Sequence, residues 1–425
     1  MQPIRMAALC VAWLVAAALG APAQPNVSNK AFTGVRLIDG TDRPPIDNAT
    51  VLVRDGRVVF AGSGAPIAAG TEVVALDGKT MIPGLINAHG HVGGTAGLEG
   101  GHYSAEHVMR DLRLYAAYGV TTIFSLGGDQ AAGFAARQSQ ATPTLDRARL
   151  FVAGPVLAPK TPDEARRLVD DDAAMNVDIV KIRVDDNLGT TSKMPPEVYR
   201  AVIDEAHKMG LRVAVHLFYL ADAKSVLDAG ADFIAHSIRD ADVDAETIAA
   251  LKKRDVCVCP TLMREVSSFV YESTPQFFSD AFFLKSADPQ LLKQLEQPAR
   301  QEAMRKSPAA QRYKVALEVA SRNLKKLSDA GVTIAMGTDS GPPARFQGYF
   351  EQIELELMAK AGLTPRQVLT AATRDAARCM KVDKDTGTLE TGKWADFVVL
   401  NADPLADIKN TRAIHSVWIA GRRVP

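Results

Sequence analysis

Four histidines lie at the ends of apolar segments that are predicted to be strands. His89 and His91 directly follow one such segment, and His216 and His236 end two later ones. Residues two apart on an extended chain face the same side, so the imidazoles of His89 and His91 can reach one cation. The chain has only eight histidines, and unrelated core histidines would rarely place four at strand ends. The pattern predicts a metal site.

Two further residues fit the same site. Lys181 lies inside the apolar segment 178–184, and Asp339 follows the sequence Met-Gly-Thr at the end of another strand candidate. Each residue alone has a structural explanation: a core histidine, an ion-paired lysine, or an aspartate that caps the next helix. The joint placement favours a metal centre built from several strand ends.

Eight strand candidates alternate with helical patterns in the middle of the chain. They span residues 81–88, 120–126, 150–157, 178–184, 212–217, 232–237, 256–262 and 332–337. Helical stretches lie between them, for example 196–209 and 221–229, each followed by glycine. This alternation predicts an α/β protein with a (β/α)₈ barrel, whose active site lies at the carboxyl ends of the strands. The alternative is an open doubly wound sheet, but no glycine-rich phosphate loop follows the first strand.

The two ends of the chain contain short strand patterns separated by turn residues. Alternating apolar residues followed by Asp55-Gly56 predict a hairpin. We expect residues 24–80 and 388–425 to form one composite small β domain, and residues 81–387 to form the barrel.

Residues 263–310 interrupt the alternation of strand candidates and helical patterns. Six aromatic residues lie between positions 269 and 283: Phe269, Tyr271, Phe277, Phe278, Phe282 and Phe283. A long connection in a barrel is typical of a lid or binding loop. The alternatives are a locally packed helical insert and a contact between copies in a homo-oligomer.

The first residues have the form of a secretory signal peptide. Arg5 precedes an apolar run over 6–19, and a small-residue cleavage pattern follows at 21–23. We expect residues 1–23 to be removed and the mature protein to be periplasmic or secreted, with no membrane segment left. Lys plus Arg and Asp plus Glu each number 49, which gives no electrostatic reason to bind nucleic acid.

Three cysteines follow the predicted signal segment. Cys257, Cys259 and Cys379 are an odd number for an exported chain, which argues against a disulfide framework. Cys257 and Cys259 alternate with valine, so we expect both to face one side of a strand as small buried apolar residues.

The combined motifs resemble the amidohydrolase superfamily over nearly the whole mature chain. They are the segment from Met81 to His91, with Lys181, His216 and His236; Gly-Thr-Asp-Ser at 337–340; and the apolar return to the small domain at 387–400. The closest resemblance is to imidazolonepropionase-related and prolidase-like enzymes. The resemblance implies a distorted (β/α)₈ TIM barrel beside a small β-sandwich-like domain. Because Lys181 lies on the fourth strand candidate, it also implies the branch of the superfamily that binds two metals, in which this lysine is carboxylated.

The resemblance also implies residue roles. His89, His91 and Asp339 bind the first of two divalent metals, most simply Zn²⁺, and His216 and His236 bind the second. The carbamate of Lys181, formed from CO₂, bridges them. A metal-bridging hydroxide attacks the scissile carbonyl, Asp339 transfers the proton, and Tyr219 donates to the oxyanion.

The implied reaction is hydrolysis of an amide or peptide-like C–N bond in a small molecule: a dipeptide, an N-acyl amino acid or a cyclic amide. Hydrolysis of an ester, lactone or phosphotriester on the same metals, and a non-catalytic binding relative, are the alternatives. The candidates for binding a substrate, chiefly its carboxylate, are His102, His107, Arg183, Arg239, Arg264 and Arg345.

Overall fold

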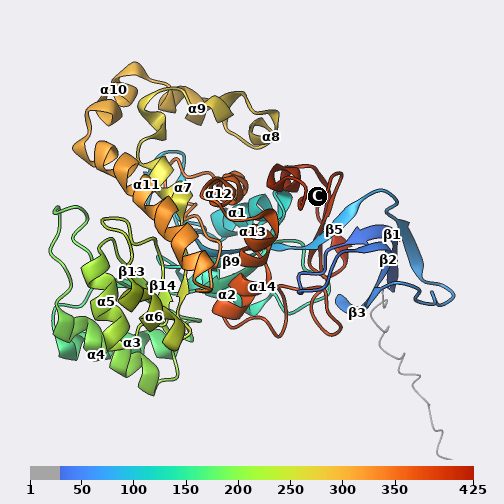
Figure 1. The fold of residues 1–425 in the computed structure, drawn as a ribbon, viewed down its shortest axis with the longest axis horizontal. Coiled ribbons are helices and arrows are strands. Elements are labelled where there is room, and N and C mark those ends of the chain that lie inside the picture. Colours follow the sequence, from blue (N-terminus) through green and yellow to red (C-terminus); the bar gives the residue numbers. More distant parts are fainter. Residues whose placement is uncertain (1–28) are drawn as a thin grey trace, which may run out of the picture.

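The computed structural model describes residues 29–425, so the predicted signal peptide lies outside the described residues. Figure 1 shows a small sheet at one side and a larger body of strands and helices beside it, with helices α8 to α10 projecting at the top. No helix in residues 29–425 is both long enough and apolar enough to cross a bilayer.

Strands from both chain ends share one mixed sheet. Its order is β18-β17-β16-β5-β1-β2-β3, with β4 paired to β1. The N-terminal strands are β1 (Lys30–Leu37), β2 (Ile46–Arg54), β3 (Arg57–Gly62), β4 (Glu72–Ala75) and β5 (Thr80–Pro83). The C-terminal ones are β16 (Phe397–Leu400), β17 (Ile414–Ile419) and β18 (Arg422–Arg423), and the antiparallel β16–β5 pair joins the two groups.

The hairpin expected at Asp55-Gly56 is confirmed. Strands β2 and β3 pair antiparallel up to Arg54 and Arg57. Both turn residues have positive φ, 51° for Asp55 and 77° for Gly56, as a two-residue turn with the twist of the strands requires. Beneath this sheet the rings of Phe32, Phe397 and Trp418 contact one another in the buried core.

Parallel strands form the centre of the larger body. One group has the order β10-β9-β6, and the other β11-β12-β13-β14-β15. The strands are β6 (Leu85–Gly90), β9 (Val120–Ser125), β10 (Arg149–Val152), β11 (Val156–Leu157), β12 (Val180–Arg183), β13 (Val213–His216), β14 (Phe233–Ile234) and β15 (Cys257–Val258). Segment 332–340 bridges parallel to β15 through Ile334 and to β6 through Ser340.

Helices alternate with these strands and give a TIM-barrel-like α/β fold. They are α1 (Ala105–Ala117), α2 (Ala131–Gln138), α3 (Pro162–Met175), α4 (Pro196–Lys208), α5 (Leu220–Ala229), α6 (Ala245–Lys253), α11 (Pro308–Asp329), α12 (Tyr349–Lys360), α13 (Pro365–Ala371) and α14 (Arg374–Cys379). Short elements are β7 (Thr95–Ala96), β8 (Glu99–Gly100) and the 3₁₀ helix η3 (Ile408–Arg412).

Three strand candidates differ in detail from the expectation. Segment 81–88 is divided between β5 and β6 at Pro83-Gly84, and β5 joins the small sheet. Segment 150–157 is divided between β10 and β11, where Gly154 has a φ of 70°. Segment 332–337 forms isolated bridges instead of a regular strand.

The interrupting segment is helical and packs against the body. It contains α7 (Leu262–Ser267), η1 (Val270–Glu272), η2 (Gln276–Ser279), α8 (Ala281–Leu284), α9 (Pro289–Leu295) and α10 (Pro298–Lys306). Phe283 is buried with Tyr349 and Phe350 of α12, and Phe277, Phe278 and Phe282 pack partly exposed against the same cluster. Phe269 belongs to a separate cluster with Phe218 and Tyr313.

The expectation that no disulfide forms is wrong. Cys257 on β15 is bonded to Cys379 at the end of α14, 122 residues away, and Cys259 is free and buried. With three cysteines after the predicted signal segment, one thiol must stay unpaired, and the fold brings the other two, Cys257 and Cys379, together. Cys257 and Cys259 do lie in one buried cluster, as expected for one face of a strand.

We expect the Cys257→Ala, Cys379→Ala double variant to lose about 2–5 kcal/mol of unfolding free energy, because the cross-link closes a long loop in the unfolded chain. Urea unfolding under non-reducing conditions would measure the loss. As a control, a reducing agent should lower the stability of the wild-type protein and leave the double variant unchanged. Three free thiols in the purified native protein would contradict the pairing.

Candidate active site

The predicted metal ligands converge at the carboxyl ends of the parallel strands. His89 is on β6, Lys181 is on β12 and His216 ends β13. His236 follows β14 by two residues, and Asp339 lies in segment 332–340. The imidazole centroids of His89 and His236 are 4.6 Å apart, and those of His216 and His236 are 4.1 Å apart.

His89, His91 and Asp339 form the tightest group. One ligand atom from each lies within 4.8 Å of the others. Nε2 of His91 is 2.8 Å from Oδ1 of Asp339, and Nε2 of His89 is 3.6 Å from the same oxygen.

Hydrogen bonds orient three of the rings. Nδ1 of His89 donates to the carbonyl of Ala235 at 2.7 Å, and Nδ1 of His91 donates to Gly127 at 2.9 Å. Nδ1 of His236 contacts Oγ1 of Thr261 at 2.7 Å. A neutral imidazole bonded in this way presents the lone pair of Nε2.

These Nε2 atoms fit a cation. A neutral His91 turns an acceptor nitrogen toward the carboxylate of Asp339, and two acceptors at 2.8 Å require a proton or a metal ion between them. Nε2 of His236 is buried and has no hydrogen-bond partner among the described residues. The donor set is therefore suited to Zn²⁺ or a similar divalent ion.

Burial keeps the deeper histidines in the ligating form. It lowers the pKa of His89 and His236 well below the usual range, and lowers the pKa of His216 to about 3 although the neighbouring Asp185 opposes the shift. These imidazoles are neutral at pH 7, and only neutral imidazole binds a metal.

Lys181 is buried among the imidazoles. Its Nζ atom lies 3.4 Å from Nε2 of His89, and its side chain is almost fully covered. Burial lowers the pKa of Lys181 to about 8, against the opposing charge of Asp339. With a pKa of about 8, roughly a tenth of the amine is neutral at pH 7.

Asp339 is held by two arginines in an unusual backbone conformation. Its φ is 57°, in the left-handed region. Oδ2 lies 2.5 Å from Nη1 of Arg345 and 3.9 Å from Nε of Arg264. Burial alone would raise its pKa, but the charge of Arg345 and the contact with His91 hold the pKa of Asp339 well below its usual range.

The predicted substrate residues occupy different environments. Arg264 and Arg345 lie beside Asp339. Arg239 is fully buried, and its Nε is 3.0 Å from Oε1 of Glu265. Arg183 donates from Nε to Oδ1 of Asp185 at 2.7 Å.

The other predicted residues point to more exposed partners. His102 is partly exposed beside Glu99, and its carbonyl accepts from Nδ1 of His107. The Tyr219 hydroxyl donates to Asp186 at 2.9 Å, and burial together with this contact raises the pKa of Tyr219 to about 12.

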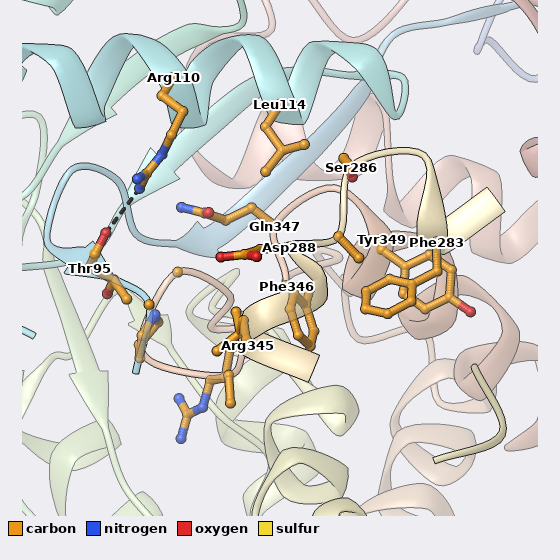
Figure 2. Close-up of a pocket in the computed structure, with 16 residues that line it drawn as sticks. Thr95, Arg110, Leu114, Phe283, Ser286, Asp288, Arg345, Phe346, Gln347 and Tyr349 are labelled. Carbon is orange, nitrogen blue, oxygen red and sulfur yellow. Dashed lines mark hydrogen bonds between the residues drawn. The ribbon is translucent and has the colours of Figure 1, made fainter. Parts of the chain in front are cut away.

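A cavity of about 210 Å³ is lined by Arg345, the arginine paired with Asp339, but by none of the six candidate metal ligands (Figure 2). Arg110 and Leu114 of α1 line one side, and the rings of Phe283, Phe346 and Tyr349 gather at one end. The cavity is thus charged at Arg110, Asp288 and Arg345 and apolar where the helical insert meets α12.

Sequence reasoning missed several acidic and hydroxyl residues around this group. Asp185 lies 3.1 Å from Nε2 of His216. Glu265 is buried between Arg239 and Arg264, and Thr261 contacts His236. Asp185 and Thr261 could have been predicted as site residues, because each lies one to three residues after the carboxyl end of a strand that leads to the site.

The chain is similar in sequence and fold to known proteins. Residues 80–424 match the Amidohydrolase family. The chain is 25% identical to the ochratoxinase of Aspergillus niger, over 91% of this chain and 84% of that protein. It is 25% identical to the imidazolonepropionase of Deinococcus radiodurans, over 89% of this chain and 92% of that protein.

A similar fold occurs in a solved Xaa-Pro dipeptidase with bound methionine. The TM-score is 0.75 at 19% identity, and the match covers 93% of this chain and 99% of the other. The family match spans well over half of the sequence. The chain therefore belongs to the amidohydrolase family.

Proposed function

We propose that the protein is a metal-dependent hydrolase of an amide or peptide-like C–N bond. The observation that carries the proposal is the convergence of His89, His91 and Asp339 within 4.8 Å. Membership in the amidohydrolase family supports the reaction class. We propose with it the finer architecture, a distorted (β/α)₈ barrel over residues 81–387 and a small β-sandwich domain from residues 24–80 and 388–425.

Two divalent cations, most simply Zn²⁺, fit the residues. His89, His91 and Asp339 would hold one cation, and His216 and His236 would hold the second. A carbamate on Lys181 would contribute to holding both cations. When bound, such cations lower the pKa of a water molecule and polarise the scissile carbonyl.

The residues of the chain would move the proton and bind the substrate. The ionised carboxylate of Asp339 would accept the proton of the attacking water and return it to the leaving nitrogen. The Tyr219 hydroxyl, which donates to Asp186 in the free protein, would turn to the developing oxyanion. Arg264 and Arg345 would bind a substrate carboxylate.

The cavity supports a substrate with a bulky apolar group. Phe283, Phe346 and Tyr349 offer large apolar area beside the charged Arg345. Among dipeptides, N-acyl amino acids and cyclic amides, we therefore favour those that combine an apolar or aromatic group with a free carboxylate.

A substrate panel tests the reaction class. Protein loaded with Zn²⁺ is assayed on N-acyl amino acids, dipeptides, cyclic amides, carboxylic esters, lactones and phosphotriesters, with chelator-treated protein as the control. We expect turnover of amides that is lost on chelation and returns with Zn²⁺. Turnover confined to esters, lactones or phosphotriesters, or amide turnover that survives complete metal removal, would reject the proposal.

Phe346→Ala is expected to raise KM about tenfold for substrates with an aryl group and little for those with a methyl group, because an apolar contact of roughly 1.5 kcal/mol is lost. Steady-state kinetics on a matched pair of N-acyl amino acids would measure the difference. Phe278→Ala is the control, since Phe278 packs in the same aromatic cluster but outside the cavity lining. An equal effect of the two substitutions would contradict the subsite.

We also propose that residues 1–23 are cleaved as a signal peptide and that the enzyme works outside the cytoplasm. The Cys257–Cys379 disulfide supports this, because disulfides persist in oxidising compartments. N-terminal sequencing of protein isolated from its native cell should begin near residue 24, and a retained Met1 on a cytoplasmic product would reject the proposal.

A further inference from the structure

A buried carboxylate lies behind the candidate metal centre. Glu351, in the first turn of α12, is 0% exposed. Its Oε1 accepts three hydrogen bonds of 2.6 Å, from Nδ2 of Asn87, Oγ1 of Thr338 and Oγ of Ser340. Burial raises the pKa of Glu351, and the hydrogen bonds from Ser340 and Thr338 oppose that shift. An ionised carboxylate is an acceptor only and suits three donors, and the helix N-terminus favours its charge.

Each donor adjoins a proposed ligand. Asn87 also accepts the backbone N–H of His89 through Oδ1, at 2.9 Å. Thr338 and Ser340 flank Asp339, so the side chains on both sides of this residue are tied to the same carboxylate oxygen. Glu351 therefore connects the backbone that carries His89 to the backbone that carries Asp339.

The connected backbones are also bonded directly. The N–H groups of Thr338 and Asp339 donate to the carbonyl of His89 at 3.1 and 2.7 Å. Asp339 is in the left-handed region, which disfavours a residue with a side chain and persists only where surrounding contacts hold it. The bonds from Thr338 and Ser340 to Glu351 supply such contacts.

The network extends to the second histidine. The Tyr115 hydroxyl on α1 contacts Oγ of Ser340 at 2.7 Å and donates to the carbonyl of His91 at 3.3 Å. The backbones of His89, His91 and Asp339 are thereby joined through one set of hydrogen bonds whose centre is Glu351.

We propose that Glu351 is a positioning residue that sets the spacing of the His89–His91 pair relative to Asp339, and so the metal affinity and turnover of the site. The proposal rests on the proposed metal-dependent function. Glu351 touches neither the ligand atoms nor the cavity, and it acts through Asn87, Thr338 and Ser340.

Glu351→Leu tests the proposal, because it leaves the three buried donors without their shared acceptor. Substitution of a residue that holds metal ligands in place without touching the metal weakens metal binding or activity by about 10- to 100-fold. We expect the Kd for Zn²⁺, measured by competition with a chromophoric chelator, to rise at least about tenfold, with a fall in kcat larger than any rise in KM. Glu351→Gln keeps a carbonyl acceptor and should restore most of the affinity.

Glu354→Leu is the matched control. Glu354 is equally buried one turn along α12, but it accepts the backbone N–H groups of Leu262 and Met263. This variant should lose thermal stability to a similar extent and keep the wild-type Kd for Zn²⁺. If Glu351→Leu does not fold, Ser340→Ala removes one link, and a raised Kd for Zn²⁺ is again expected.

Two results overturn the proposal in different ways. A Kd for Zn²⁺ that is unchanged in Glu351→Leu, or in Ser340→Ala where Glu351→Leu does not fold, rejects the positioning role alone. Wild-type protein that binds neither Zn²⁺ nor another divalent cation rejects the proposed function and the positioning role together.

Discussion

Asp339→Asn is expected to reduce kcat by about 10³-fold, within the range of 10²- to 10⁴-fold that a positioned general base contributes. Burial alone would raise the pKa of Asp339, but Arg345 and His91 hold the pKa well below its usual range, so the side chain is a carboxylate at neutral pH. Asparagine keeps the shape of the side chain but removes its negative charge beside His91, and it removes the basic oxygen that would take the proton in the proposed reaction.

The measurement combines kinetics with metal analysis, because loss of a ligand and loss of a base both lower turnover. Asp288→Asn is the control: Asp288 lines the cavity and caps α9 by accepting the N–H of Gln290, and asparagine caps a helix equally well. Asp288→Asn should keep kcat within about twofold, since a preserved cap costs little stability. An Asp339→Asn variant that keeps its metal and its full kcat would rule out proton transfer by Asp339.

The placement of the six candidate ligands could be predicted because it depends on local patterns. Strands can be recognised in the sequence as alternating or unbroken runs of apolar residues. Parallel strands that alternate with helices place their carboxyl ends at one edge of the barrel. His89, Lys181 and His216 are within strands or at their ends in the structure, as expected. The segment near Asp339 could be recognised by its motif, although it pairs through isolated bridges.

The contacts around these ligands could not be predicted, because they join segments far apart in the sequence. Glu351 is a charged residue within a helix, and nothing local indicates that Asn87 and Ser340 will surround it. Cys257 and Cys379 are likewise joined only by the fold. Such pairings depend on side-chain positions that a pattern of apolar residues leaves open.

Gly337, the first residue of the motif at 337–340, is explained by a close contact between two segments of the chain. A Cβ on Gly337 would lie 2.8 Å from the backbone nitrogen of His89. Backbone atoms cannot yield as a flexible side chain can, so segment 332–340 approaches β6 this closely only with glycine at this position. The motif therefore reflects strand contact as well as chemistry.

Lys181→Met is expected to reduce kcat/KM at least about 100-fold, because loss of the proposed anion between the two proposed cations would forfeit several kcal/mol of charge stabilisation. As an ammonium, Lys181 has three donors and no acceptor, so it cannot bind a cation. Burial lowers the pKa of Lys181 to about 8, which makes the neutral amine available to add CO₂. A carbamate formed in this way would offer two oxygens to the proposed cations, and methionine fills the same volume without either.

Three measurements separate the carbamate from a merely structural lysine. Metal analysis of Lys181→Met should show the loss of at least one cation per chain, and short carboxylic acids such as acetate should partly restore both metal and activity. Native mass spectrometry of the metal-loaded wild-type protein should show the added mass of CO₂, and Lys181→Met should lack it. Lys208→Met is the control, since Lys208 is an exposed lysine of α4 paired with Glu205. An active protein with two metals and an unmodified Lys181 would overturn the carbamate bridge.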